Sequence, residues 1–155
     1  MAVILIVEDE APLLVLAESV LQQAGHDTLS AGSLAQAQAI IHSDSQFDLV
    51  FTDIGLVDQR EGGLQVGQSL GEARHGIPVL YTSGMTMTDG MSSLFATPSE
   101  FLPKPYRENE LLDAVCFAHP SSDCRLGPVP DSQDQKRQHG ESVDQLGRRL
   151  HFLGG

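Results

Sequence analysis

Along the first 119 residues, short apolar runs alternate with segments in which apolar residues recur every three or four positions. The short runs are rich in aliphatic residues and lack helical periodicity, which is typical of strands buried on both faces of a parallel sheet. They predict strands at residues 2–7, 27–31, 47–53, 77–82 and 101–102. The periodic segments predict helices at about residues 12–24, 34–41, 64–75, 89–95 and 108–119.

Boundary residues agree with several of these elements. Pro12 suits the first turn of a helix, Gly25 suits a helix end, and Ser33 followed by Gln36 forms a capping-box pattern. The fourth helix has the weakest prediction, since Met, Thr, Ser and Gly have little helix propensity. Five alternations of strand and helix predict an α/β fold: one parallel sheet with helices on both faces and right-handed crossovers.

The composition changes after Pro120. Pro, Ser, Gly, Asp and Gln dominate residues 120–141, which is typical of a linker. We therefore expect one domain at residues 1–119 and a polar linker or tail at 120–155. Within the tail, apolar residues near 142–153 permit a short amphipathic helix, which Gly147 weakens, and its docking or fraying is left open.

Charge and hydropathy exclude some classes of protein. The net charge is −12, and residues 1–119 hold sixteen acidic side chains against four basic ones. Such a surface repels a phosphate backbone, so direct binding of nucleic acid is not expected. No apolar run approaches the roughly 20 residues of a membrane span, and the N-terminus lacks signal-peptide features, so we expect a cytoplasmic protein without membrane insertion. Two cysteines, Cys116 and Cys124, lack CxxC spacing, and a disulfide is not expected.

Chemically useful side chains follow four of the predicted strands. Glu8 and Asp9 follow the first strand, Asp53 ends the third, Ser83 follows the fourth, and Lys104 follows the fifth. In open parallel sheets, ligands bind outside the carboxyl ends of the strands. Three carboxylates at this edge repel one another, and Mg²⁺, which prefers oxygen ligands, would relieve the repulsion. Asp53 is then the candidate nucleophile for a phosphoryl group, with Ser83 and Lys104 as contacts to its oxygens.

Four segments together resemble the receiver domain of two-component response regulators. They are Ile4–Glu10, Asp48–Asp53, Pro78–Gly84 and Phe101–Tyr106, and the resemblance covers about residues 2–119. It implies a flavodoxin-like (βα)5 fold with a five-stranded parallel sheet in the order 2-1-3-4-5. It also implies that the chain is a phosphorylation-controlled switch rather than an enzyme.

The same resemblance implies a role for each site residue. Asp53 would accept a phosphoryl group from a histidine kinase or histidine phosphotransfer protein, with Ser83 as the switch hydroxyl and Lys104 as the phosphate-contacting lysine. Mg²⁺ would bind Glu8, Asp9, Asp53 and the backbone carbonyl of Gly55, and Phe101 would be the aromatic switch. Thr82 lies one position too early for the hydroxyl role. The loop after Asp53 departs from the family, with Val57 where a proline is common.

The leading hypothesis is a stand-alone receiver that signals through the surface of its fourth helix, fifth strand and fifth helix to an unknown downstream protein. Phe95, Phe101, Tyr106 and Leu111 are candidate readout residues, although core packing is the better interpretation for Leu111. A phosphorelay intermediate, a phosphate sink and a homodimer stay open. A Mg²⁺-dependent aspartyl phosphohydrolase is a remote alternative, because Gly55 stands where such enzymes usually place a second acid. A degenerate receiver used only for interactions is disfavoured by the intact acidic and lysine positions.

Overall fold

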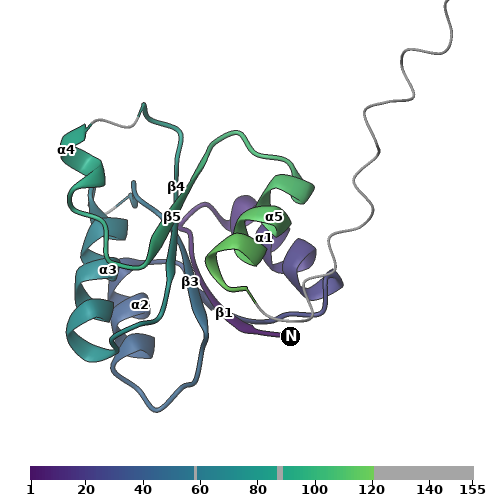
Figure 1. The fold of residues 1–155 in the computed structure, drawn as a ribbon, viewed down its shortest axis with the longest axis horizontal. Helices are drawn as coiled ribbons and strands as arrows, with labels where there is room; N and C mark the ends of the chain where they lie inside the picture. The colour runs from purple at the N-terminus through teal and green to yellow at the C-terminus, as the bar shows by residue number, and fades with distance from the viewer. Residues whose placement is uncertain (58, 87–88, 121–155) are drawn as a thin grey trace, which may run out of the picture. The chain divides into compact units, whose positions relative to one another are not determined.

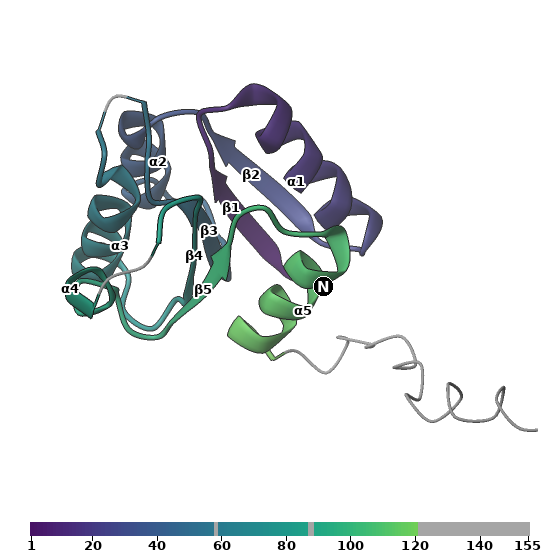
Figure 2. The same cartoon turned by 90° about the horizontal axis from the view of Figure 1, so that it is seen from above.

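A computed structural model describes residues 1–57, 59–86 and 89–120 of the chain. Within these residues, five parallel strands form one sheet in the order β2-β1-β3-β4-β5. Figures 1 and 2 show α1 and α5 on one face of this sheet and α2, α3 and α4 on the other. The elements are β1 Val3–Val7, α1 Ala11–Gln23, β2 Asp27–Ala31, α2 Leu34–Ile41, β3 Leu49–Asp53, α3 Gly62–Ala73, β4 Val79–Ser83, α4 Asp89–Ser92, β5 Ser99–Pro103 and α5 Glu108–Ala118.

The predicted fold class and strand order are confirmed, and all ten elements occur in the predicted sequence. The bounds of β2 and α2 agree fully, and Ser33 caps α2 by accepting a hydrogen bond from the amide of Gln36 at 3.2 Å. The fourth helix is shorter than the predicted 89–95. After α4, the amides of Leu94 and Phe95 bond three residues back, to Met91 and Ser92, so the chain leaves the helix in turns. This agrees with the low helix propensity of the segment.

Two apolar clusters hold the sheet between its helices. One packs side chains of β1, β3 and β4 against α2 and α3, with Met91 of α4 at its edge. The other packs the opposite face of the sheet against α1 and α5. Strand residues alternate between the two clusters, as the two-residue period of a strand requires.

This alternation decides which side chains meet at the carboxyl edge of the sheet. Ile6, Phe51, Leu80 and Leu102 belong to the cluster under α1 and α5. The residues two positions further on lie at or just beyond the ends of four neighbouring strands: Glu8, Asp53, Thr82 and Lys104. The fold therefore brings two carboxylates, a hydroxyl and an ammonium to the same face of one edge.

Two expectations about individual residues are wrong. The three- and four-residue spacing of apolar residues in the first helix predicts one apolar stripe that includes Leu13, Leu16, Ala17, Val20 and Leu21. In the structure Ala17, Val20 and Leu21 are buried, but Leu16 is 47% exposed. The stripe is wider than the area that the sheet covers. Cys116 of α5 is disulfide-bonded. The missing CxxC spacing did not exclude this, because a disulfide depends on the distance between two Cα atoms and not on a fixed spacing.

Arg74, which follows α3, ties this helix to the connection between α2 and β3. Its guanidinium donates hydrogen bonds to the backbone carbonyls of Ile41, Ser43 and Ser45 and lies 4.7 Å from the ring centroid of Phe47. Among the residues that the structure describes, no helix is long and apolar enough to cross a membrane. The proposed amphipathic helix near 142–153 lies outside the described residues.

Candidate functional site

Asp53 ends β3 with both carboxylate oxygens engaged. The residue is 8% exposed. Its Oδ1 accepts a hydrogen bond from the amide of Gly55 at 3.0 Å, and its Oδ2 accepts one from Nζ of Lys104 at 2.6 Å. β3 is buried along its whole length and pairs with β1 and β4, so the position of Asp53 is fixed by the centre of the sheet.

Lys104 joins Asp53 to Glu8. Its ammonium lies 2.8 Å from Oε2 of Glu8 and 2.6 Å from Oδ2 of Asp53. Glu8 is almost fully buried, and its Oε1 accepts the amide of Glu10 at 3.1 Å. Residues just after β1, at the end of β3 and just after β5 are thus connected by one partly buried cation, although they lie far apart in the sequence.

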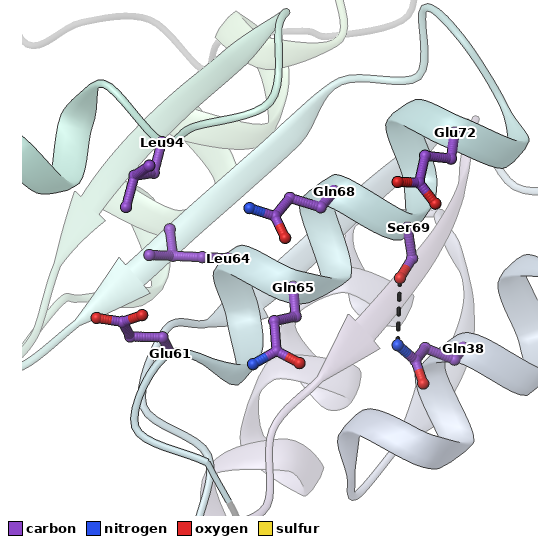
Figure 3. Close-up of a pocket in the computed structure, with 8 residues that line it drawn as sticks. All are labelled: Gln38, Glu61, Leu64, Gln65, Gln68, Ser69, Glu72 and Leu94. Atoms are coloured by element: carbon purple, nitrogen blue, oxygen red, sulfur yellow. Dashed lines mark hydrogen bonds between the residues drawn. The ribbon is translucent and has the colours of Figure 1, made fainter.

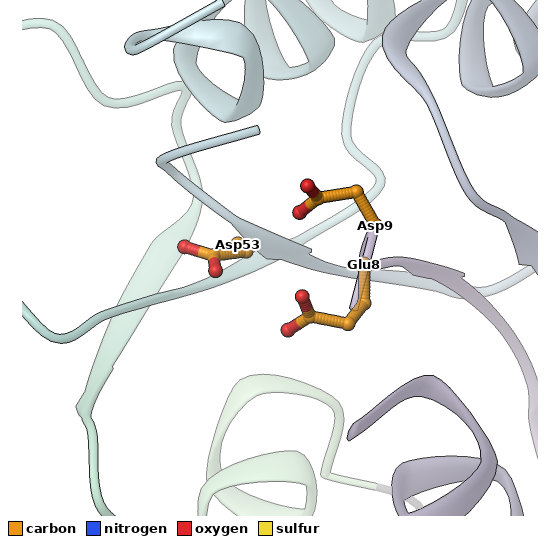
Figure 4. A group of neighbouring side chains, drawn as sticks. All are labelled: Glu8, Asp9 and Asp53. Atoms are coloured by element: carbon orange, nitrogen blue, oxygen red, sulfur yellow. The ribbon is translucent and has the colours of Figure 1, made fainter. Parts of the chain in front are cut away.

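Asp9 completes a cluster of three carboxylates. One oxygen from each of Glu8, Asp9 and Asp53 lies within 4.8 Å of the others. Figure 4 shows the carboxyl groups of Glu8 and Asp9 pointing toward Asp53 from opposite sides of the end of β1. Oδ2 of Asp9 accepts the amide of Val57 at 2.9 Å, which ties the loop after β3 to the cluster.

Burial and pairing act on the charges of this cluster in opposite ways. Burial raises the pKa of Glu8, and the hydrogen bond from Lys104 only partly opposes this. Burial alone would lower the pKa of Lys104, but its hydrogen bonds to Asp53 and Glu8 outweigh that effect and raise the pKa. The cluster combines three carboxyl groups with one ammonium group, so oxygen donors outnumber the cation. A divalent cation with oxygen preference fits such a donor set.

A cavity of about 410 Å³ opens beside the cluster. Asp9, Asp53, Gly55 and Ser83 all line it, so the structure brings together most of the predicted site residues. Ser83 is buried, and its Oγ accepts the amide of Met85 at 3.1 Å, which holds the hydroxyl at the end of β4. Lys104 lines a neighbouring cavity with Leu13, Leu16 and Tyr106 among others, and Gly84 belongs to the lining of both cavities.

Phe101 lies on the opposite face of the sheet from Asp53. It pairs with Tyr81 in the β4–β5 register and packs at the edge of the cluster under α2 and α3. Its ring centroid is 6.2 Å from that of Phe95, which in turn stacks on Tyr81 at 4.2 Å. Leu111 is buried in the other cluster, in agreement with the interpretation as a core residue.

Two further residues lie beside Asp53: sequence reasoning missed Gly63 and set Thr82 aside. Gly63 lies so close to the end of β3 that a Cβ atom there would be 2.1 Å from the carbonyl oxygen of Asp53. The adjacent glycines at 62 and 63 were the available signal. Thr82 is fully buried, and its Oγ1 has no hydrogen-bond partner within the described residues.

Residues 4–116 match the family described as the response regulator receiver domain. The chain belongs to this family. Among solved structures, a response regulator receiver protein from Sinorhizobium medicae WSM419 is 32% identical, with a TM-score of 0.68 over 75% of this chain and 92% of that one. The receiver domain of the hybrid histidine kinase CckA is 25% identical, with a TM-score of 0.62 over 75% of this chain and 97% of that one.

A more distant CheY-like receiver domain protein from Methanospirillum hungatei JF-1 shares the fold. It is 24% identical, with a TM-score of 0.65 over 74% of this chain and 90% of that one. Comparison with curated proteins finds no match. The assignment of the chain to the receiver family therefore rests on the match to residues 4–116 and on the similarity to the S. medicae protein.

The receiver domain has a further cavity of about 390 Å³ on α3 (Figure 3). Its lining is mostly polar and includes Gln38, whose side-chain amide donates to Oγ of Ser69 at 3.2 Å. Among the described residues, it shares no lining residue with the cavity beside Asp53. The cavity beside Asp53 is therefore the one in which the carboxylates and Ser83 meet.

Proposed function

We propose that this receiver domain accepts a phosphoryl group on Asp53 and uses the modification to switch a protein-interaction surface. The observation that carries the proposal is the joint placement of Asp53, Lys104 and Ser83. Asp53 lines a cavity, accepts a hydrogen bond from the partly buried ammonium of Lys104 and shares the lining of the cavity with Ser83. A carboxylate in this position can act as a nucleophile, and the ammonium and the hydroxyl can then contact the phosphoryl group that it carries.

The transfer balances without a further reactant. An oxygen of the Asp53 carboxylate forms a bond to phosphorus, while the bond from phosphorus to its donor breaks. The electron pair of the broken bond leaves with the donor, which is a histidine imidazole in a kinase or phosphotransfer protein, or acetate when acetyl phosphate is used. Lys104 neutralises charge on the incoming group, and Ser83 donates a hydrogen bond to one of its oxygens.

The donor set beside Asp53 fits Mg²⁺. Three carboxylates lie within reach of one another, and Gly55 lines the same cavity as Asp9 and Asp53. We assign the ion to Glu8, Asp9, Asp53 and the carbonyl of Gly55. When bound, Mg²⁺ would neutralise charge on the transferring phosphoryl group. Glu8 must also keep its contact with Lys104, so Asp9 and Asp53 are the more available ligands of the three.

The output surface is assigned to α4, β5 and α5. Phosphorylation adds roughly 1.5 to 2 negative charges beside Ser83 and Lys104. Ser83 ends β4 and Lys104 follows β5. Phe101 of β5 packs against the ring of Phe95, three residues after α4, so movement at the site reaches this surface through packed rings. The partner on this surface is a protein, because the acidic domain repels nucleic acid.

NMR spectroscopy of the full chain tests the switch. With Mg²⁺, addition of beryllofluoride as a phosphoryl mimic should shift amide signals at residues 89–106 as well as those of the site. The variant Asp53→Asn should show none of these shifts, and the matched control Asp48→Asn, just before the same strand, should keep them. Shifts confined to the site in the wild type would contradict a switched surface.

A relay or a phosphate sink uses the same site and differs from an output switch in the fate of the phosphoryl group. The lifetime of the acyl phosphate, measured with and without histidine phosphotransfer proteins, separates these roles. Rapid loss of the phosphoryl group only when such a protein is present would identify a relay.

A further inference from the structure

Thr82 carries a buried polar group that the function proposed above leaves unused. Its side chain is fully buried in β4, and its hydroxyl has no hydrogen-bond partner among the described residues. Two of its neighbours on the same face are apolar: Leu80 precedes it by two residues in the same strand, and Leu102 is its Cα partner on β5. A valine would fill this place without leaving a hydroxyl unsatisfied. A threonine is therefore useful here only if a hydrogen-bond donor reaches its hydroxyl in another state of the site.

The strand register brings Thr82 next to that site. Thr82 is the Cα partner of Asp53 across the β3–β4 pair, and neighbouring strands lie about 4.8 Å apart. The alternation of the strands places both side chains on the face under α1 and α5, which is also the face of Glu8 and Lys104. The unpaired hydroxyl is thus adjacent to the residue that we propose to be phosphorylated.

The ammonium of Lys104 has one N–H donor more than its two contacts with carboxylates use. An ammonium group has three N–H donors. Within the described residues, two of them are directed at Oε2 of Glu8 and Oδ2 of Asp53. A third donor and an unpaired acceptor therefore lie on the same face of the same edge.

We propose that Thr82 is a positioning residue for Lys104: its hydroxyl accepts a hydrogen bond from the ammonium once Asp53 carries a phosphoryl group. Phosphorylation moves negative charge outward from the Asp53 carboxylate, and Lys104 must turn to follow it. The turn weakens the contact with Asp53, and the hydroxyl of Thr82 replaces it from the adjacent strand. This inference rests on the proposed phosphoryl acceptance at Asp53.

Three variants of the full chain test the proposal. Thr82→Val removes the hydroxyl at nearly constant volume, and Thr82→Ser restores it. Thr52→Val is the matched control, because Thr52 is equally buried and lies next to Asp53 in β3. Its side chain is on the opposite face, and its hydroxyl donates to the carbonyl of Asp53 at 3.0 Å.

Two readouts are needed. The first is the rate of phosphorylation by acetyl phosphate with Mg²⁺, where Thr82→Val should be slower by about tenfold, the order expected for one hydrogen bond to a charged group. The second is the NMR signal of the Lys104 ammonium in the beryllofluoride-bound protein. In the wild type, in Thr82→Ser and in Thr52→Val this signal should be protected from exchange with solvent, and in Thr82→Val the protection should be lost.

Thermal unfolding of the metal-free protein separates positioning from a purely structural role. Thr82→Val should unfold at or above the wild-type temperature, since it removes an unsatisfied group, whereas Thr52→Val should unfold below it. A Thr82→Val variant with wild-type phosphorylation and an unchanged Lys104 signal would show that the hydroxyl is merely tolerated, and would overturn the inference. A wild-type protein that does not respond to beryllofluoride would instead overturn the proposed function.

Discussion

Substitution of Gly63 by alanine should disturb the site through the backbone. The new Cβ atom would lie 2.1 Å from the carbonyl oxygen of Asp53, 2.7 Å from Cα of Ile54 and 2.8 Å from the carbonyl carbon of Asp53. All three are backbone atoms, so no side chain can rotate out of the way. Either the start of α3 or the end of β3 must move.

The size of the effect follows from two opposing contributions. Alanine in place of glycine in a helix stabilises by about 0.5–1 kcal/mol. Overpacking against atoms that cannot move aside costs about 1–3 kcal/mol or more. We expect a net loss of about 1–2 kcal/mol for Gly63→Ala, which lowers the unfolding temperature of a domain of this size by roughly 4–8 °C.

Gly71→Ala in the same helix is the matched control, because a Cβ atom there meets nothing within 4 Å. It should be stabilised by about 0.5–1 kcal/mol. Urea denaturation followed by circular dichroism gives both values, with equal m-values confirming a comparable unfolded state. Only Gly63→Ala should also slow the phosphorylation of Asp53. Equal stability of the two variants would refute the close approach of α3 to the end of β3.

Three further changes test other parts of the structure. Burial raises the pKa of Glu8 above its ordinary value of 4.5, so the native state binds this proton more tightly than the unfolded chain does. The unfolding free energy of the metal-free protein should therefore fall as the pH rises from 4.5 through the raised pKa. Glu8→Gln should lack this fall, and equal pH profiles of the two proteins in urea denaturation would contradict the raised pKa. Gly67→Ala brings a Cβ atom 1.9 Å from the hydroxyl of Tyr81 and should destabilise the domain by about 1–3 kcal/mol. The loss should be smaller in a Tyr81→Phe background, and additive effects in a double-mutant cycle would refute this contact. Arg74→Met removes three hydrogen bonds to backbone carbonyls and should lower the unfolding free energy, measured in urea, by about 2 kcal/mol. Asp53 of this variant should be phosphorylated at the wild-type rate, and a slower rate would show that the region around Arg74 acts on the site.

Much of the fold could be predicted because the signals were local or periodic. The strand that ends at Asp53 is a continuous apolar run, and Ser33 with Gln36 marks the start of α2 by a cap that the structure contains. The carboxyl ends of parallel strands share one edge, so the order of Glu8, Asp53 and Lys104 along the chain was enough to bring them together. In the structure, Lys104 contacts both carboxylates.

The features that could not be predicted depend on distances between elements. The alternation of apolar residues shows which side of α1 faces inward, but it does not show how far the sheet extends under Leu16. The adjacent glycines at 62 and 63 permit a close approach, but they do not show that backbone atoms of Asp53 and Ile54 lie beside Gly63. The hydroxyl of Thr82 has no hydrogen-bond partner among the described residues, and this too depends on packing, because a threonine in a strand is ordinary by itself.

The most direct test of the account is the intact mass of the chain after incubation with acetyl phosphate. With Mg²⁺, the wild-type protein should gain the mass of one phosphoryl group, and removal of the metal by a chelator should abolish the gain. Asp53→Asn should gain nothing under either condition, while Asp48→Asn should behave as the wild type. A phosphoryl group on the Asp53→Asn variant, or none on the wild type, would contradict the assignment of Asp53 as the phosphoryl acceptor.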